Sequence, residues 1–169
     1  MAHRMVRGVA MTMQQPIRIR NTAEFLSHAL ALEREAAARY RELSRRMVDF
    51  GNRLTADLFE RLACFEAEHA KQLEGKIVGM TLPALTASTS AWLDAEAPET
   101  TPLDSIFPEM TPLDALALAL RCEHRAARFF GQVAATSENP NVRGIAAEMM
   151  REETEHVAWV EKAMAQAAG

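Results

Sequence analysis

Apolar residues recur at intervals of three and four along four stretches of this chain, the pattern of a helix with one buried face. The first stretch runs from Asn21 to about Phe50, and the second from about Arg53 to Val78. A third begins at Thr111, and a fourth begins near Asn139-Pro140. The pattern therefore predicts an all-α chain of four long helices.

Local signals mark the ends of these helices. Asn21 is followed three residues later by Glu24, which is typical of a capped helix start. Thr111 is followed by Pro112 and then by Asp114, so it is a good N-cap with proline at the first helical position. The Gly51-Asn52 pair is a very short link. It predicts that the first two helices form an antiparallel hairpin.

A long connection, about residues 79–110 and rich in Pro, Thr and Ser, separates the second helix from the third. A helix of about 26 residues is ~39 Å long, and such a connection can span that length. We expect an antiparallel four-helix bundle made of two helical hairpins, joined by a long crossover. We also expect a short helix around Ala84 to Asp94 and anchoring of the crossover by the apolar residues Trp92, Leu93, Ile106 and Phe107.

The composition is that of one ordinary globular domain. The chain has 169 residues, of which 49% are hydrophobic and 25% charged. Residues 1–20 are expected to be a flexible N-terminal extension, and residues 21–169 to be the bundle. The net charge of −4 gives no basic face for nucleic acid. No apolar run is long enough for a membrane span.

The two cysteines, Cys64 and Cys122, fit neither a disulfide nor a zinc spacing. Free thiols favour a reducing compartment, so we expect a cytoplasmic protein. We also expect both thiols to be buried, because free cysteine behaves as a small hydrophobic residue.

Six polar residues interrupt the apolar faces. The motif Glu-x-x-His occurs in the second helix and again in the fourth, and the first and third helices each carry one glutamate on the apolar face. The glutamates of the two copies, Glu66 and Glu153, are as far apart in the sequence as the two histidines, His69 and His156. The chain therefore contains two related hairpins whose polar groups should meet at one centre. The six residues are Glu33, Glu66, His69, Glu123, Glu153 and His156.

The burial of these six polar side chains is best explained by bound metal ions. Four carboxylates close together in a low-dielectric core repel one another and would be forced to take up protons. Two divalent cations balance their charge, and residues three apart on a helix can reach the same ion. Carboxylates with one imidazole per ion suit iron or manganese, while zinc is a possible substitute. The sequence thus predicts a dinuclear metal site.

Neighbouring polar residues serve as internal controls. Four glutamates lie well away from the apolar faces and are expected in solvent: Glu35, Glu68, Glu152 and Glu155. His28 and His124 are also off these faces. Tyr40 lies two turns beyond Glu33 on the same face, where a buried hydroxyl needs a partner. We expect it to be a core aromatic residue, and a hydrogen bond to a metal ligand is an alternative role.

These motifs resemble the ferritin-like superfamily and, within it, the rubrerythrin-type di-iron proteins. The resemblance covers residues 21 to 165. It rests on Glu33-x-x-Ala36-x-x-Arg39-Tyr40, on Glu123-x-x-Ala126-x-x-Phe129-Phe130, on Leu62-Ala63-Cys64-Phe65-Glu66-Ala67-Glu68-His69 and on Glu153-Thr154-Glu155-His156. It implies two iron ions, with Glu66 and Glu153 as bridging ligands. The terminal ligands would then be Glu33 with His69 and Glu123 with His156, in some pairing.

The chain departs from the family pattern in three places. Classical rubrerythrins carry a further glutamate one turn after the ligand of the third helix, where this chain has Ala126. The four cysteines of a rubredoxin-type iron site are missing, so electrons would come from a separate donor protein. The six-ligand set equally resembles bacterioferritin. The haem-binding methionine of that family is replaced by Ala67, which argues against haem.

The leading functional hypothesis is therefore a di-iron oxidoreductase that reduces peroxide or dioxygen. One alternative is an iron-binding ferroxidase of ferritin type. Another is a helical interaction module that binds metal for stability. The expected partners are the oxidant, the electron-donor protein and a second copy of the chain in a homodimer.

Overall fold

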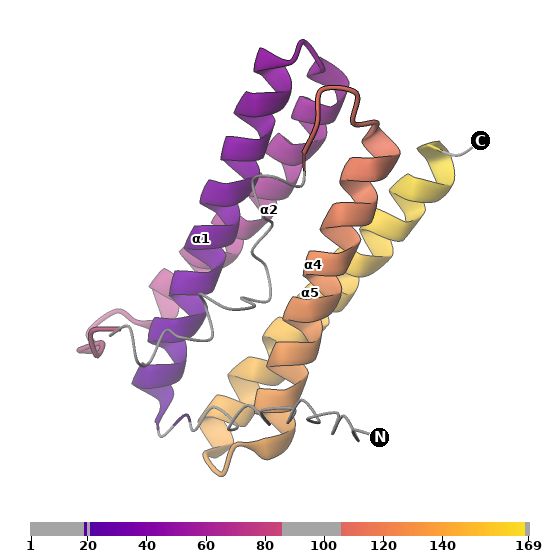
Figure 1. The fold of residues 1–169 in the computed structure, drawn as a ribbon. Helices are drawn as coiled ribbons and strands as arrows, with labels where there is room; N and C mark the ends of the chain where they lie inside the picture. The colour runs from indigo at the N-terminus through magenta and orange to yellow at the C-terminus, as the bar shows by residue number, and fades with distance from the viewer. Residues whose placement is uncertain (1–18, 20, 86–105, 168–169) are drawn as a thin grey trace, which may run out of the picture.

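The computed structural model describes residue 19 and residues 21–85 and 106–167, and within these ranges the chain is helical (Figure 1). The helices are α1 (Thr22–Asp49), α2 (Arg53–Lys76), α4 (Pro112–Thr136) and α5 (Pro140–Ala167). They match the four predicted stretches, with α2 ending slightly earlier than expected. The prediction of an all-α bundle is confirmed.

The predicted caps lie at the helix starts. The Asn21 side chain accepts a hydrogen bond from the Glu24 backbone N–H at 2.9 Å. Thr111 and Asp114 form a complete capping box at the start of α4. Gly51, between α1 and α2, has a φ of 78°, a left-handed conformation that glycine adopts without strain. These signals are local, which is why the sequence alone could place them.

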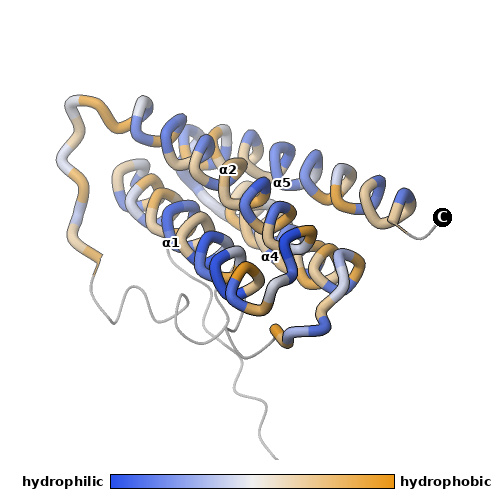
Figure 2. Tube along the Cα trace, turned by 90° about the horizontal axis from the view of Figure 1, so that it is seen from above, coloured by the Kyte–Doolittle hydropathy of each residue, from blue (hydrophilic) through white to orange (hydrophobic). Residues whose placement is uncertain are grey.

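The helices pair as two hairpins, α1 with α2 and α4 with α5. In both views α1 and α4 lie in one layer and α2 and α5 in the other (Figures 1 and 2). Hydrophilic and hydrophobic positions alternate around each helix in Figure 2, as expected for helices with one buried face.

The core consists of two apolar clusters, one toward each end of the bundle. The first combines the N-terminal part of α1 with the C-terminal part of α2 and includes Phe25, Leu73 and Phe130. The second combines the C-terminal part of α1 with the N-terminal part of α2 and includes Met47 and Phe59. The start of α4 lies in the second cluster and its end in the first, so α4 runs parallel to α2.

Because α2 and α4 are parallel, the crossover segment, residues 77–111, must travel the length of the bundle. Hydrogen bonds hold the described residues of this segment against opposite ends of the bundle. The Ser27 hydroxyl donates to the Pro83 carbonyl at 3.0 Å, near the start of α1. The Thr55 hydroxyl donates to the Met110 carbonyl at 3.2 Å, near the start of α2. The predicted long crossover is confirmed.

Some expectations fall outside the described residues: the N-terminal extension up to residue 18, most of the short helix around 84–94, and Trp92 with Leu93. Ile106 packs against the second apolar cluster, as expected. Phe107 does not anchor the crossover, since it is 45% exposed.

The prediction that both thiols are buried was wrong for one of them. Cys64 is exposed, whereas Cys122 is buried as expected. No described helix is long and apolar enough to span a membrane.

Candidate metal centre

A polar layer separates the two apolar clusters, and all six predicted site residues lie in it. The two Glu-x-x-His motifs come from α2 and α5, and the single glutamates come from α1 and α4. The four glutamates are fully buried, with at most 1% of each side chain exposed. The spacing of three within each motif places both of its side chains on the inward face of one helix.

Two of the carboxylates lie between both imidazoles. Glu153 Oε1 is 3.4 Å from His69 Nδ1, and its Oε2 is 3.7 Å from His156 Nδ1. Glu66 is placed in the same way, with Oε2 at 3.9 Å from His69 Nδ1 and Oε1 at 4.0 Å from His156 Nδ1. Each carboxylate therefore directs one oxygen to each half of the cluster, as a ligand that bridges two ions must.

The other two carboxylates each approach one imidazole. Glu33 Oε2 lies 3.5 Å from His69 Nδ1. Glu123 Oε2 lies 3.3 Å from His156 Nδ1, within hydrogen-bonding distance. The six side chains thus divide into two halves, Glu33 with His69 and Glu123 with His156, with Glu66 and Glu153 between them.

Burial and mutual repulsion dominate the electrostatics of this cluster. Burial alone would lower the pKa of His69, but the nearby Glu153 and Glu33 carboxylates outweigh it and raise this pKa to about 10. Burial raises the pKa of Glu153 well above its usual value. His69 opposes that shift, while Glu33 and Glu123 add to it. In the absence of metal the cluster therefore holds extra protons at neutral pH.

The cluster has the properties of a cation site. Among the residues that the structure describes, no hydrogen-bond partner is found for either oxygen of Glu33 and Glu153 or for Nδ1 of His69, and all five atoms are buried. Each such group costs about 1–3 kcal/mol when it stays unsatisfied. One ligand atom from each of Glu66, His69, Glu153 and His156 lies within 4.8 Å of the others. The carboxylates and neutral imidazoles are the donors that iron and manganese prefer, so the residues fit a pair of such ions.

Tyr40 is buried beside this cluster. Its hydroxyl donates a hydrogen bond to Glu123 Oε1 at 3.3 Å, and its ring stacks on Phe59 with a centroid distance of 6.2 Å. Both sequence interpretations therefore describe part of its environment, because the ring packs in the core and the hydroxyl contacts a candidate ligand.

The control residues separate into two groups. Glu68, Glu155 and His124 are exposed, as expected. Glu35 and Glu152 are only partly exposed, and burial raises the pKa of Glu152. His28 is buried, with 2% of its surface exposed, and burial lowers its pKa. His28 is next to Ser27 in α1, and the Ser27 hydroxyl donates a hydrogen bond to Pro83 of the crossover segment. The crossover segment therefore lies against this part of α1.

Sequence reasoning missed an aromatic pair at the edge of the cluster. The Phe65 ring lies 5.1 Å from the His156 ring, and the Trp159 ring meets Phe65 edge-on at 5.2 Å. The sequence signal was the position of Phe65 directly before Glu66. The contact with His156 needs α2 and α5 to be neighbours, which the pattern alone does not give.

Comparisons with known proteins show which family the chain resembles. The family model named Rubrerythrin matches residues 24–98. The crystal structure of an uncharacterised conserved protein from Magnetospirillum magnetotacticum MS-1 is 34% identical to the chain, with a TM-score of 0.68. That match covers 86% of this chain and 95% of the other.

The chain belongs to the rubrerythrin family of the ferritin-like superfamily. Rubrerythrins typically bind two iron ions, and the buried Glu/His cluster of this rubrerythrin lies where four helices converge. No protein of curated function shows significant sequence similarity to it. The function of this family member must therefore be argued from its own site.

Proposed function

We propose that this rubrerythrin is a cytoplasmic di-iron carboxylate oxidoreductase that reduces peroxide or dioxygen. The observation that carries the proposal is the placement of Glu66 and Glu153, each with one oxygen toward each of two imidazoles. A structural site for one ion needs no such pair of shared carboxylates. The charge of four carboxylates also equals that of two divalent cations.

In this proposal Glu66 and Glu153 would be shared by the two ions, Glu33 and His69 would hold one of them, and Glu123 and His156 would hold the other. Reduction of hydrogen peroxide to two water molecules consumes two electrons and two protons, and a pair of ferrous ions at this site would supply the electrons. The hydroxyl of Tyr40 holds Glu123 in place. The two apolar clusters shield the site from water at both ends of the bundle.

We also propose that a separate one-electron donor protein re-reduces the site, since these 169 residues contain two cysteines and a rubredoxin-type site needs four. Ala67 leaves no methionine for haem at that position. We further propose that the protein acts as a homodimer.

The test is anaerobic loading with Fe(II), followed by one equivalent of hydrogen peroxide per pair of ions. We expect two iron ions per chain and rapid loss of both peroxide and Fe(II), in a ratio of one to two. The Glu66→Gln variant should lose this reaction, and Glu68→Gln, at an exposed position of the same helix, should retain it. Bound iron that reacts no faster than free Fe(II) would contradict the proposal and leave a structural role for the metal.

A ferroxidase of ferritin type is the second candidate. The feature that favours it is Ala126, which is fully buried where classical rubrerythrins have a further glutamate. Iron storage needs a large hollow shell of many chains. Small-angle scattering of the iron-loaded protein distinguishes the two functions, since a dimer excludes storage and a shell supports it.

A further inference from the structure

Solvent reaches the polar layer from one face of the bundle. The side chains of His69 and His156 are 9% and 14% exposed, whereas the four glutamates are almost fully covered. Both histidines lie on α2 and α5, the two helices of one layer (Figures 1 and 2). A molecule approaching the centre therefore meets the α2–α5 face, and His156 is the more accessible of the two imidazoles.

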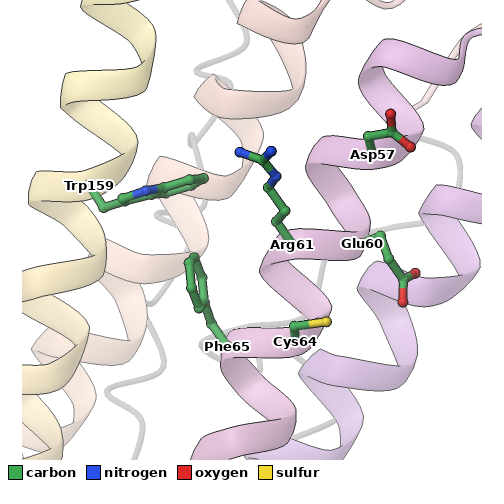
Figure 3. Close-up of a pocket in the computed structure, with 6 residues that line it drawn as sticks. All are labelled: Asp57, Glu60, Arg61, Cys64, Phe65 and Trp159. Carbon is green, nitrogen blue, oxygen red and sulfur yellow. The ribbon is translucent and has the colours of Figure 1, made fainter.

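A surface pocket opens on this face, with a volume of about 510 Å³. Trp159 lines it from α5, and the other lining residues come from α2 (Figure 3). These are Asp57, Glu60, Arg61, Cys64 and Phe65; Arg61 extends toward Trp159, and the Cys64 thiol points away from the two aromatic rings. The pocket is far larger than hydrogen peroxide, and it is within the size range of pockets for organic ligands. Three of its six lining residues are charged, but most of the surface that faces the pocket is apolar, so it can hold an organic molecule.

Phe65 separates the pocket from the cluster. Its ring contacts Trp159 on one side and the His156 ring on the other, with centroid distances of 5.2 and 5.1 Å. One aromatic side chain therefore lies between a solvent-filled depression and a candidate metal ligand. A rotation of this single side chain would change how much of His156 the pocket exposes.

The two copies of the Glu-x-x-His motif differ at the residue directly before the glutamate. Phe65 directly precedes Glu66 in the first Glu-x-x-His motif, and Glu152 directly precedes Glu153 in the second. At the corresponding place the other half of the site thus has a carboxylate instead of a ring. Only the His156 half has an aromatic cover of this kind among the described residues.

We propose that the pocket between α2 and α5 is the entry site for the oxidant, and that Phe65 determines which oxidants reach the centre. In the native protein Phe65 admits hydrogen peroxide or dioxygen and excludes organic hydroperoxides, although the pocket itself can hold them. This inference rests on the proposed function for the identity of the oxidant. The position of the entry site is independent of it.

The first experiment uses the metal-free protein and so does not depend on redox activity. Diethyl pyrocarbonate at fixed pH modifies accessible imidazoles, and peptide mass spectrometry gives the extent at His156, His69 and the exposed His124. Phe65→Ala should raise modification of His156 several-fold and leave His124 unchanged, and Phe65→Leu should give a smaller rise. Phe129→Ala is the matched control, because Phe129 is a partly buried phenylalanine on α4, packed against the other apolar cluster.

Chemical modification of Cys64 should have the opposite effect and reduce access to His156. It is exposed and lines the pocket, while Cys122 is buried. A bulky maleimide on Cys64 should fill the pocket and slow modification of His156, and a methylthio group should have little effect. Cys64→Ser should abolish the slowing. Unchanged His156 modification in folded Phe65→Ala, or an equal rise in Phe129→Ala, would overturn the proposed entry site.

The second experiment tests the size selection in the iron-loaded protein. We expect Phe65→Ala to increase the rate with tert-butyl hydroperoxide several-fold relative to the rate with hydrogen peroxide. An unchanged ratio would overturn the role of Phe65 in selection. If the iron-loaded native protein reacts with neither peroxide nor with dioxygen, the proposed function fails, and the His156 modification still decides whether the pocket leads to the centre.

Discussion

His69 and His156 stack with parallel rings, their centroids 4.7 Å apart. They occupy the same position in the two Glu-x-x-His motifs, so the stack lies where the two related hairpins meet. Like charges at this distance repel, which disfavours two protonated imidazoles at once. Two neutral imidazoles, each facing its own carboxylates, are the state that metal binding requires.

Replacement of a shared carboxylate should remove the stabilisation by metal without unfolding the protein. At a free metal concentration of 100 Kd, the native protein should gain about 2.7 kcal/mol of unfolding free energy. Glu153→Gln should gain almost none, and its metal-free form should be at least as stable as the native one, because the variant no longer buries a carboxylate. Thermal and chemical unfolding with and without Mn(II) measure both effects. Glu155→Gln, at an exposed position on the same helix, is the control and should behave as the native protein does.

Metal binding should release protons at pH 7. The pKa of His69 is raised to about 10, and the pKa of Glu153 is also raised, so the metal-free site holds protons that the ions displace. Metal affinity should therefore rise with pH over the range from 6 to 8. Calorimetric titration in buffers of different ionisation enthalpy counts the released protons. Binding without proton release would show that the free carboxylates and imidazoles are already unprotonated.

The metal-free protein should lose stability as pH rises from about 6.5 to about 10. His69 has a higher pKa in the folded state than its ordinary 6.5, so its proton stabilises the fold fully below 6.5 and the contribution disappears through about 10. The raised pKa of Glu153 acts in the same direction, because the folded state holds that proton more tightly. Urea unfolding in the presence of a chelator measures the slope. His69→Gln should flatten it; an equally steep slope in that variant would assign the effect to other groups.

Tyr40→Phe should weaken metal binding with little loss of core packing. The variant removes the hydrogen bond to Glu123 but keeps the ring that stacks on Phe59. Loss of such a supporting hydrogen bond costs about 10–100-fold in metal affinity, and the length of 3.3 Å favours the lower end. Competition with a coloured chelator gives the affinity. Unchanged affinity would restrict Tyr40 to the role of a core aromatic residue.

The polar layer could be predicted because helical periodicity fixes which residues share a face. Glu66 and His69 are three apart, as are Glu153 and His156, and the two glutamates of the other helices fall on their apolar faces. The six side chains are brought together as expected. Their binding of metal remains a prediction from charge and burial.

The same reasoning failed at Cys64 and at His28. Cys64 was expected in the core as a small apolar residue, and it is exposed on α2. His28 was expected away from the core, and it is buried beside the contact between Ser27 and Pro83. The crossover that makes this contact has no periodic signal of its own.

The sequence by itself determined the four helices, their caps and the six polar residues of the inward faces, because these depend on interactions within a few residues of chain. Only the tertiary structure decided that α2 and α5 share a layer, and therefore that Phe65 contacts both His156 and Trp159. It also decided how the carboxylates divide between the two imidazoles. Such contacts join residues far apart in the chain, and their geometry is set by how whole helices pack.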